Sequence, residues 1–209
     1  MRELIVNTFL TLDGVMQAPG GPEEDPSEGF EHGGWSFGYW DGQMEKSMEE
    51  TMSKPFDLVL GRTTYEIFAA YWPRAEGPAA EPLNKATKHV ASTTLKELDW
   101  QNSKLIEGDL PAGVRALKEE DGPELQVHGS ANLIQTLLEH GLIDEFRLYI
   151  FPVVLGKGKR LFDGGAVPAG LELTHSDVSS TGVIMAIYRT GADIKYGSFA
   201  DEAASETGA

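Results

Sequence analysis

Short apolar runs alternate with segments of helical spacing through the first two thirds of the sequence. The first run, Leu4–Leu12, is rich in β-branched residues and Phe, which predicts a buried strand. Within Asp41–Ser53, methionines recur at every fourth position and form one apolar stripe, so we expect a helix there. The same reasoning predicts strands at Asp57–Leu60, Lys88–Ser92, Lys104–Ile106 and Leu125–His128, and helices over Arg62–Tyr71, after Asp109 and after Ser130.

Local signals mark the ends of these helices. Thr63-x-x-Glu66 matches a capping box, in which a hydroxyl and a carboxylate bind free backbone N–H groups. Asp109 shortly before Pro111 is typical of a helix start, and Gly141 suits the left-handed conformation that ends a helix.

The last third of the sequence has a different pattern. Glu145–Leu155 predicts a long strand, and the tripeptide Ser180-Thr181-Gly182 is typical of a hairpin turn. Further strands are predicted at Glu172–Ser179, Val183–Tyr188 and Ile194–Ser198. Strand–helix units followed by a meander predict an α/β fold: a single three-layer domain with a mixed, mostly parallel sheet flanked by helices, and a C-terminal antiparallel β-meander.

We expect this domain to span residues 1–199, followed by an acidic tail at 200–209. Gln17–Gly34 is rich in Gly, Pro and acids, and is either a disordered surface loop or an active-site lid. An aromatic cluster follows it directly and favours docking on an apolar surface: Trp35, Phe37, Tyr39 and Trp40.

Composition narrows the function classes. The 209 residues include 17 Lys and Arg against 33 Asp and Glu, a net charge of −16, and no Cys. The acidity argues against nucleic acid or an anionic membrane as a partner, and the missing thiols exclude disulfides and zinc–thiolate sites. The sequence has neither a secretory signal nor an apolar stretch that could span a membrane, so we expect a cytoplasmic protein. Walker A, Gly-x-Gly-x-x-Gly, His-Glu-x-x-His and Gly-x-Ser-x-Gly motifs are absent, and we expect no metal site.

Three junctions after predicted strands share small and hydroxyl residues. Parallel strands would bring these junctions to one carboxyl edge, where open α/β sheets bind ligands and helix N-termini favour phosphate. Each also has a structural interpretation, because Thr63 and Ser130 suit N-caps and Arg62 suits an ion pair. The junctions are Gly61-Arg62-Thr63-Thr64, Ser92-Thr93-Thr94 and Gly129-Ser130-Ala131.

These motifs together resemble the dihydrofolate reductase-like superfamily, in the branch related to the reductase domain of bacterial riboflavin biosynthesis. The resemblance covers roughly Leu4 to Phe199 in order. Besides the junctions, it rests on Thr11-Leu12-Asp13-Gly14, Gly141-Leu142-Ile143-Asp144-Glu145, Pro152-Val153-Val154-Leu155-Gly156-Lys157-Gly158 and Arg160-Leu161-Phe162.

The resemblance implies an NADPH-dependent reductase that holds its cofactor across the carboxyl edge of the sheet. It places cofactor phosphates at Gly61, Arg62, Thr63 and Thr64, and the pyrophosphate at Gly129, Ser130 and Ala131. Ser92, Thr93 and Thr94 would lie near the adenosine 2′-phosphate, which Arg62 or Lys88 would read. Asp13 and Gly14 would lie beside the nicotinamide, with Val154 to Gly156 closing that side.

Reduction of a C=N or C=O bond also needs a proton donor. The candidates are Asp13, Asp41 and Glu45, because a carboxyl group beside apolar rings has a raised pKa. The alternatives are a turn residue for Asp13 and a solvated helix face for the other two.

Two functions remain. The first is an NADPH-dependent reductase of a small heterocycle resembling a pterin, a folate or a riboflavin precursor. The alternative is a non-catalytic nucleotide- or pterin-binding module. In either case we expect a small-molecule ligand and a homodimer.

Overall fold

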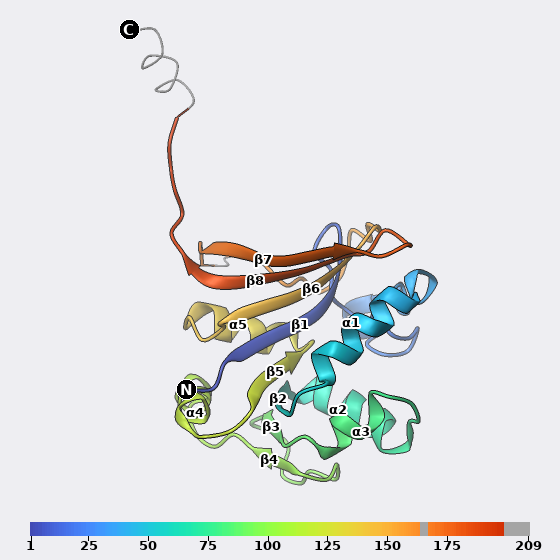
Figure 1. The fold of residues 1–209 in the computed structure, drawn as a ribbon. Helices are drawn as coiled ribbons and strands as arrows, with labels where there is room; N and C mark the ends of the chain where they lie inside the picture. Colours follow the sequence, from blue (N-terminus) through green and yellow to red (C-terminus); the bar gives the residue numbers. More distant parts are fainter. Residues whose placement is uncertain (164–166, 199–209) are drawn as a thin grey trace, which may run out of the picture.

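The computed structural model describes residues 1–163 and 167–198 (Figure 1). These residues form eight strands and five α-helices. The strands and four of the helices follow one another in the predicted order, whereas the helix at Ala80–Lys85 has no counterpart among the predicted elements. The strands are β1 (Leu4–Thr11), β2 (Phe56–Gly61), β3 (Lys88–Ala91), β4 (Ser103–Leu105), β5 (Glu124–His128), β6 (Glu145–Phe151), β7 (Gly170–Val178) and β8 (Ile184–Ala192). The helices are α1 (Gly42–Met52), α2 (Arg62–Tyr71), α3 (Ala80–Lys85), α4 (Leu110–Glu119) and α5 (Ala131–Glu139), and single 3₁₀ turns lie at Ser27–Gly29, Phe37–Tyr39 and Trp72–Arg74.

All eight strands form one sheet in the order β4-β3-β2-β5-β1-β6-β8-β7. The strands from β4 to β6 pair in parallel, whereas β8 is antiparallel to both β6 and β7. This confirms the predicted mixed, mostly parallel sheet with an antiparallel C-terminal part.

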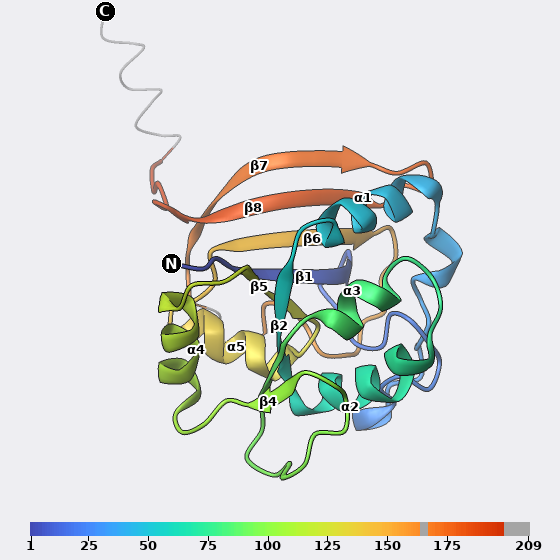
Figure 2. The same ribbon diagram turned by 60° about the horizontal axis from the view of Figure 1, so that its bottom comes forward.

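Helices cover both faces of the sheet (Figures 1 and 2). On one face, α4 and α5 pack Val114, Leu133 and Ile134 on the inward side chains of β1 and β5. On the other face, α1 packs on Tyr149 and Phe151 of β6, and α2 and α3 pack on β2 and β3. The central strand β1 is therefore buried on both sides, which explains its nearly continuous apolar sequence.

Helix ends follow the sequence signals only in part. Asp109 caps α4 by accepting a hydrogen bond from the N–H of Ala112, and Gly141 has φ of +59°, as predicted. The capping box at Thr63 is wrong, because the N-cap of α2 is Gly61, two residues before Thr63. Glu66 instead pairs with Arg62 at 3.0 Å.

The predicted strand Ile194–Ser198 is also wrong. The chain leaves the sheet after Ala192, and residues 193–198 pair with no strand in the part of the chain that the structure describes. The expected tail at 200–209 lies outside the described residues. Among the helices of residues 1–163 and 167–198, none is long and apolar enough to cross a bilayer.

Candidate functional site

A deep cleft opens at the carboxyl edge of the parallel strands, between α1 and α2. Its volume is about 1640 Å³, larger than the roughly 300–1000 Å³ of a typical small-molecule pocket, so it has room for two ligands. The middle of β1, the loop Met16–Asp25, the inward faces of α1 and α2, and the ends of β3 and β5 line it.

The three predicted junctions meet along one wall of this cleft. Every one of their ten residues lines it, from 61–64, 92–94 and 129–131. Ser130 connects two of the junctions, because its Oγ accepts a hydrogen bond from the N–H of Gly61 at 2.9 Å. A Cβ built on Gly129 would lie 3.6 Å from Oγ1 of Thr64, so the backbone at Gly129 lies close to the Thr64 side chain.

The helices α2 and α5, which begin on this wall, lack side-chain caps, whereas α1 and α4, which begin elsewhere, have them. Helix α3, which begins at Ala80, also lacks one among the described residues. Asp41 accepts hydrogen bonds from the first turn of α1, and Asp109 does so for α4. No described side chain does this for α2 or α5. Ser130, the N-cap of α5, has φ of +67° and follows Gly129 at +64°, so its hydroxyl points to Gly61 rather than to its own helix. The free N–H groups of two helix N-termini therefore face the cleft, and these groups bind anions.

Arg62 supplies the positive charge of this wall. Its Nη1 donates to Oγ1 of Thr94 at 2.8 Å and its Nε donates to Glu66 at 3.0 Å. Lys159, the other basic side chain among the described residues of the cleft, is already paired with Asp25 at 2.7 Å. The guanidinium of Arg62 is about half exposed and lies beside the Ser92–Thr94 junction.

Lys88 does not reach this wall, which removes it as the alternative phosphate reader. Its side chain is fully buried, and Nζ donates to the carbonyls of Asn84 and Gln101 and lies 4.1 Å from the ring centroid of Trp100. Burial lowers its pKa from 10.5 to about 8.

The residues predicted beside the nicotinamide, Asp13, Gly14, Val154 and Gly156, lie outside the cleft lining. The carboxylate of Asp13 accepts hydrogen bonds from Oγ1 of Thr11 at 2.6 Å and from the N–H of Gly156 at 2.8 Å. Burial opposes ionisation, but these bonds outweigh it and lower the pKa of Asp13 to about 2. Asp13 thus joins the end of β1 to the loop after β6, and this geometry does not support proton donation.

Asp41 also has a structural role. Besides capping α1, its carboxylate accepts hydrogen bonds from the N–H and hydroxyl of Ser180 at 2.9 and 2.6 Å. The bond from the Ser180 hydroxyl, aided by the N–H of Met44, lowers the pKa of Asp41. Of the three acids considered as proton donors, only Glu45 lines the cleft.

The aromatic cluster divides between core and cleft. Trp35 and Tyr39 pack edge-on against Phe151, whereas Trp40 lines the cleft and Phe37 is exposed. The preceding loop is held in place, since Nε2 of Gln17 donates to the carbonyls of Asp25 and Ser27. Residues 17–25 of this loop line the cleft, and this position supports the interpretation of the loop as a lid.

The floor of the cleft contains polar residues that sequence reasoning missed. Asn7 of β1 lies in register with His128 of β5 and with Arg147 of β6, and both Asn7 and His128 line the cleft. A single asparagine inside an apolar strand was the available signal. Its neighbours on the floor come from strands more than 100 residues away, and only strand register reveals them.

Comparison with known proteins finds relatives over most of the chain. Two relatives from Bacillus subtilis (strain 168) match most of the chain. The uncharacterized protein YyaP is 29% identical over 196 residues, which cover 90% of this chain and 94% of that protein. The uncharacterized protein YwjB is 26% identical over 163 residues, which cover 77% and 83%.

Solved structures share the fold. A protein from Shewanella sp. PV-4 whose name assigns it to riboflavin biosynthesis has a TM-score of 0.66 at 21% identity, covering 91% of this chain and 99% of that one. A pyrimidine reductase-like protein from Corynebacterium diphtheriae has a TM-score of 0.59 at 13% identity, covering 92% and 93%. Dihydrofolate reductase from Enterococcus faecalis, complexed with NADP(H) and RAB-propyl, has a TM-score of 0.57 at 14% identity, covering 91% and 97%.

A family model described as the RibD C-terminal domain matches residues 2–185, most of the chain. The chain therefore belongs to the RibD C-terminal domain family and is a reductase-like protein with a dihydrofolate reductase-like fold.

Proposed function

We propose that this protein is an NADPH-dependent reductase that transfers a hydride to a small heterocycle resembling a pterin, a folate or a riboflavin precursor. The observation that carries the proposal is the pair of uncapped helix N-termini, α2 and α5, side by side on one cleft wall. Backbone N–H groups, hydroxyls and one guanidinium are the donor set that a dinucleotide needs. The residues present therefore fit this cofactor.

The cofactor's pyrophosphate is assigned to the Gly129–Ala131 and Gly61–Thr64 junctions. Arg62, held by Thr94 beside Ser92 and Thr93, is assigned to the 2′-phosphate. When bound, the dinucleotide supplies the hydride, and the chain supplies position and electrostatics. The net charge of −16 does not by itself oppose this, because exposed charges farther away than the screening length of about 8 Å at physiological salt have little effect on the site.

The remaining volume of the cleft suits a planar substrate. Met48 and Met52 of α1 face Ile67 and Phe68 of α2 across it, and Trp40 closes one end. Glu45 is the acid that remains a candidate for holding a proton near the substrate, since it lines this space.

Cofactor titration tests the proposal. NADPH should raise the melting temperature of the protein and be oxidised when a dihydropterin, folate or flavin-precursor substrate is added. Arg62→Ala should weaken NADPH binding by about tenfold or more and NADH binding by clearly less, because a charge-assisted bond to phosphate is worth about 1.5–3 kcal/mol. Arg115→Ala, on the exposed side of α4, is the matched control.

Equal weakening of NADPH and NADH would refute the role of Arg62, and no stabilisation by either dinucleotide would refute the proposed function. The alternative function, a binding module without turnover, is favoured by one observation: the predicted donors Asp13 and Asp41 both lie outside the cleft lining. Cofactor binding with no oxidation on the whole substrate panel would support it.

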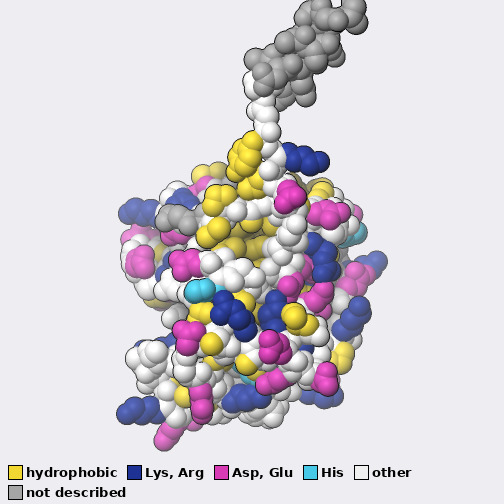
Figure 3. Space-filling view, turned by 90° about the vertical axis from the view of Figure 1, so that its left-hand side faces the viewer, with side chains coloured by type: hydrophobic (Ala, Val, Ile, Leu, Met, Phe, Trp, Pro, Cys, Tyr) yellow, Lys and Arg dark blue, Asp and Glu magenta, His cyan; other side chains and the backbone are white. Residues whose placement is uncertain are grey.

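We also propose a cytoplasmic homodimer. Strand β7 forms the edge of the sheet, and Leu173 and Val178 on it are each more than half exposed. Hydrophobic side chains gather in the upper part of the face shown in Figure 3, above a lower part with charges of both signs. An uncovered edge strand with apolar side chains is a ready surface for a second copy. A monomeric mass by light scattering at micromolar concentration would contradict this proposal.

A further inference from the structure

Asn7 is a buried polar residue without a partner. Its side chain is 5% exposed, and neither Nδ2 nor Oδ1 has a hydrogen-bond partner in the described part of the chain. Leaving one buried donor or acceptor unpaired costs about 1–3 kcal/mol, so an apolar residue would suit the free protein better. The side chain lies in the cleft lining, on the same face of β1 as Phe9, so a bound ligand can supply the missing partners.

His128 lies next to Asn7 on the cleft floor and is fixed in one tautomer. Nε2 of Gln126 is 2.6 Å from the carboxylate of Glu124 and 3.3 Å from the carbonyl of Thr51, so it is the donor end of that amide. Oε1 of Gln126 is therefore an acceptor, and it lies 2.8 Å from Nε2 of His128. The proton of His128 consequently resides on Nε2, and Nδ1 is left as an acceptor.

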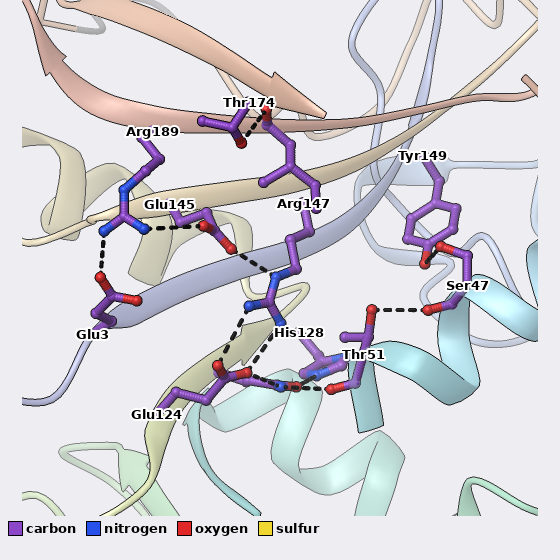
Figure 4. Close-up of polar contacts among 12 residues, drawn as sticks. Glu3, Ser47, Thr51, Glu124, His128, Glu145, Arg147, Tyr149, Thr174 and Arg189 are labelled. Atoms are coloured by element: carbon purple, nitrogen blue, oxygen red, sulfur yellow. Dashed lines mark hydrogen bonds and ion pairs between the residues drawn. The ribbon is translucent and has the colours of Figure 1, made fainter. Parts of the chain in front are cut away.

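Figure 4 shows what holds this arrangement in place. Arg147 donates to Glu124 at 3.0 and 3.3 Å and to Glu145 at 2.7 Å. The other carboxylate oxygen of Glu145 lies 3.6 Å from Arg189. Burial and, to a smaller degree, the charge of Arg147 lower the pKa of His128 from 6.5 to about 4, so the imidazole is neutral at physiological pH. The network ends at the cleft with an acceptor on His128 beside the free amide of Asn7.

We propose that Asn7, assisted by Nδ1 of His128, binds the amide edge of a planar ligand in the cleft. A primary or cyclic amide presents a C=O group next to an N–H group, which matches the donor and acceptor of an asparagine side chain. The terminal torsion of asparagine is broad, so a small rotation brings Nδ2 and Oδ1 to face the ligand. Two sources share this chemistry: the carboxamide of the nicotinamide, and a lactam in the heterocyclic substrate.

The inference rests on the proposed function, and paired probes separate the two. NADPH is compared with its acetylpyridine analogue, in which a methyl group replaces the amide NH₂. Lumazine, a pteridine with two lactam groups, is compared with its N,N-dimethyl derivative, which lacks both N–H donors. Dissociation constants are measured by calorimetry for the wild type, Asn7→Leu and Ser103→Ala. Ser103 is the matched control because its Oγ is also buried and unpartnered but lies outside the cleft lining.

Asn7→Leu should weaken one of the two probes that carry an N–H group by about tenfold or more, since two hydrogen bonds are lost. It should weaken the matching analogue clearly less, because that analogue keeps only the carbonyl acceptor. A loss of affinity for NADPH assigns the site to the cofactor's carboxamide, and a loss of affinity for lumazine assigns it to the substrate. The same variant should raise the melting temperature of the free protein by about 2–4 °C, because the unpaired amide is removed. Ser103→Ala should leave all four affinities unchanged.

Equal affinities of the wild type and Asn7→Leu for both amide-bearing probes would overturn the inference, even if NADPH binds well. A wild type that binds lumazine but not NADPH would refute the proposed function and leave the lactam assignment standing. A wild type that binds neither probe would overturn both.

Discussion

Asp13 and Asn7 lie on or just after the same strand, yet they have opposite surroundings. Asp13 follows the end of β1 and has hydrogen bonds from Thr11, Leu155 and Gly156, with Arg160 3.4 Å away. Asn7, in the middle of β1, has no partner for either polar atom within the described residues. Asp13 lies outside the cleft and Asn7 lines it.

This difference separates structural polar groups from groups that await a ligand. A polar side chain whose hydrogen bonds are all made inside the protein has little left to offer a substrate, and its pKa is adapted to its partners. A buried polar side chain without partners reduces the stability of the free protein, so its presence on a cleft floor points to binding. We therefore propose Asn7, rather than Asp13, as the polar residue of this segment that binds a ligand.

The largest effect that tests the comparison is expected for Asp13→Ala. Removing this carboxylate leaves the N–H groups of Leu155 and Gly156 without their acceptor and takes away one contact of Arg160, so the free energy of unfolding should fall by about 3 kcal/mol. Turnover per folded molecule should stay within about twofold, which corresponds to about 0.4 kcal/mol. Denaturant unfolding and steady-state rates measure the two quantities. A variant of normal stability that has lost its turnover would return Asp13 to the catalytic site.

The two ends of β1 also show what a sequence can and cannot predict. The junctions at 61–64 and 129–131 were predictable because strand, glycine and helix signals lie within a few residues of one another. The place of Asp13 was not, because its partners at Leu155 and Gly156 are about 140 residues away in the sequence. The role of Thr63 was misjudged for a similar reason: Gly61 starts the helix earlier, in a position set by the hydrogen bond from its N–H to Ser130.

The fold was easier to predict than the site. The period of the apolar residues predicts all eight strands of the described chain, most of which bury at least one face. The segment Ile194–Ser198 has the same alternation but forms no strand. Strand β7 already forms this edge of the sheet, and no strand of the described chain pairs with residues 194–198. Asn7, His128 and Arg147 become neighbours only through the register of three strands, which periodicity does not provide.

Lys88 provides a second, smaller test, because it is buried like Asn7 but has partners. Its folded-state pKa of about 8 lies below the ordinary value of 10.5, so the unfolded state binds the proton more strongly. The wild type should therefore become more stable as the pH rises from 8 to 10.5, by an amount on the order of 2 kcal/mol. Lys88→Met keeps the stem against Trp100 and should abolish that rise, as measured by urea unfolding across this pH range. An equal rise in both proteins would show that Lys88 is not its source.

Ser130 is intermediate between Asp13, whose partners lie inside the protein, and Asn7, which has none, and its substitution should give the smallest effect. Its oxygen is used inside the protein, as the acceptor for the N–H of Gly61, while its hydroxyl hydrogen remains available to a ligand on the cleft wall. Ser130→Ala should therefore lower both properties modestly, the free energy of unfolding by about 1 kcal/mol and the affinity for NADPH by about three- to tenfold. Thr136→Ala, nearly two turns further along α5, also changes a cleft-lining hydroxyl but keeps the junction intact, and is the comparison variant. If Ser130→Ala loses stability without losing affinity, Ser130 belongs with Asp13 among the structural groups. If it loses affinity alone, Ser130 belongs with Asn7, and the free N–H groups of α5 need this hydroxyl to hold an anion.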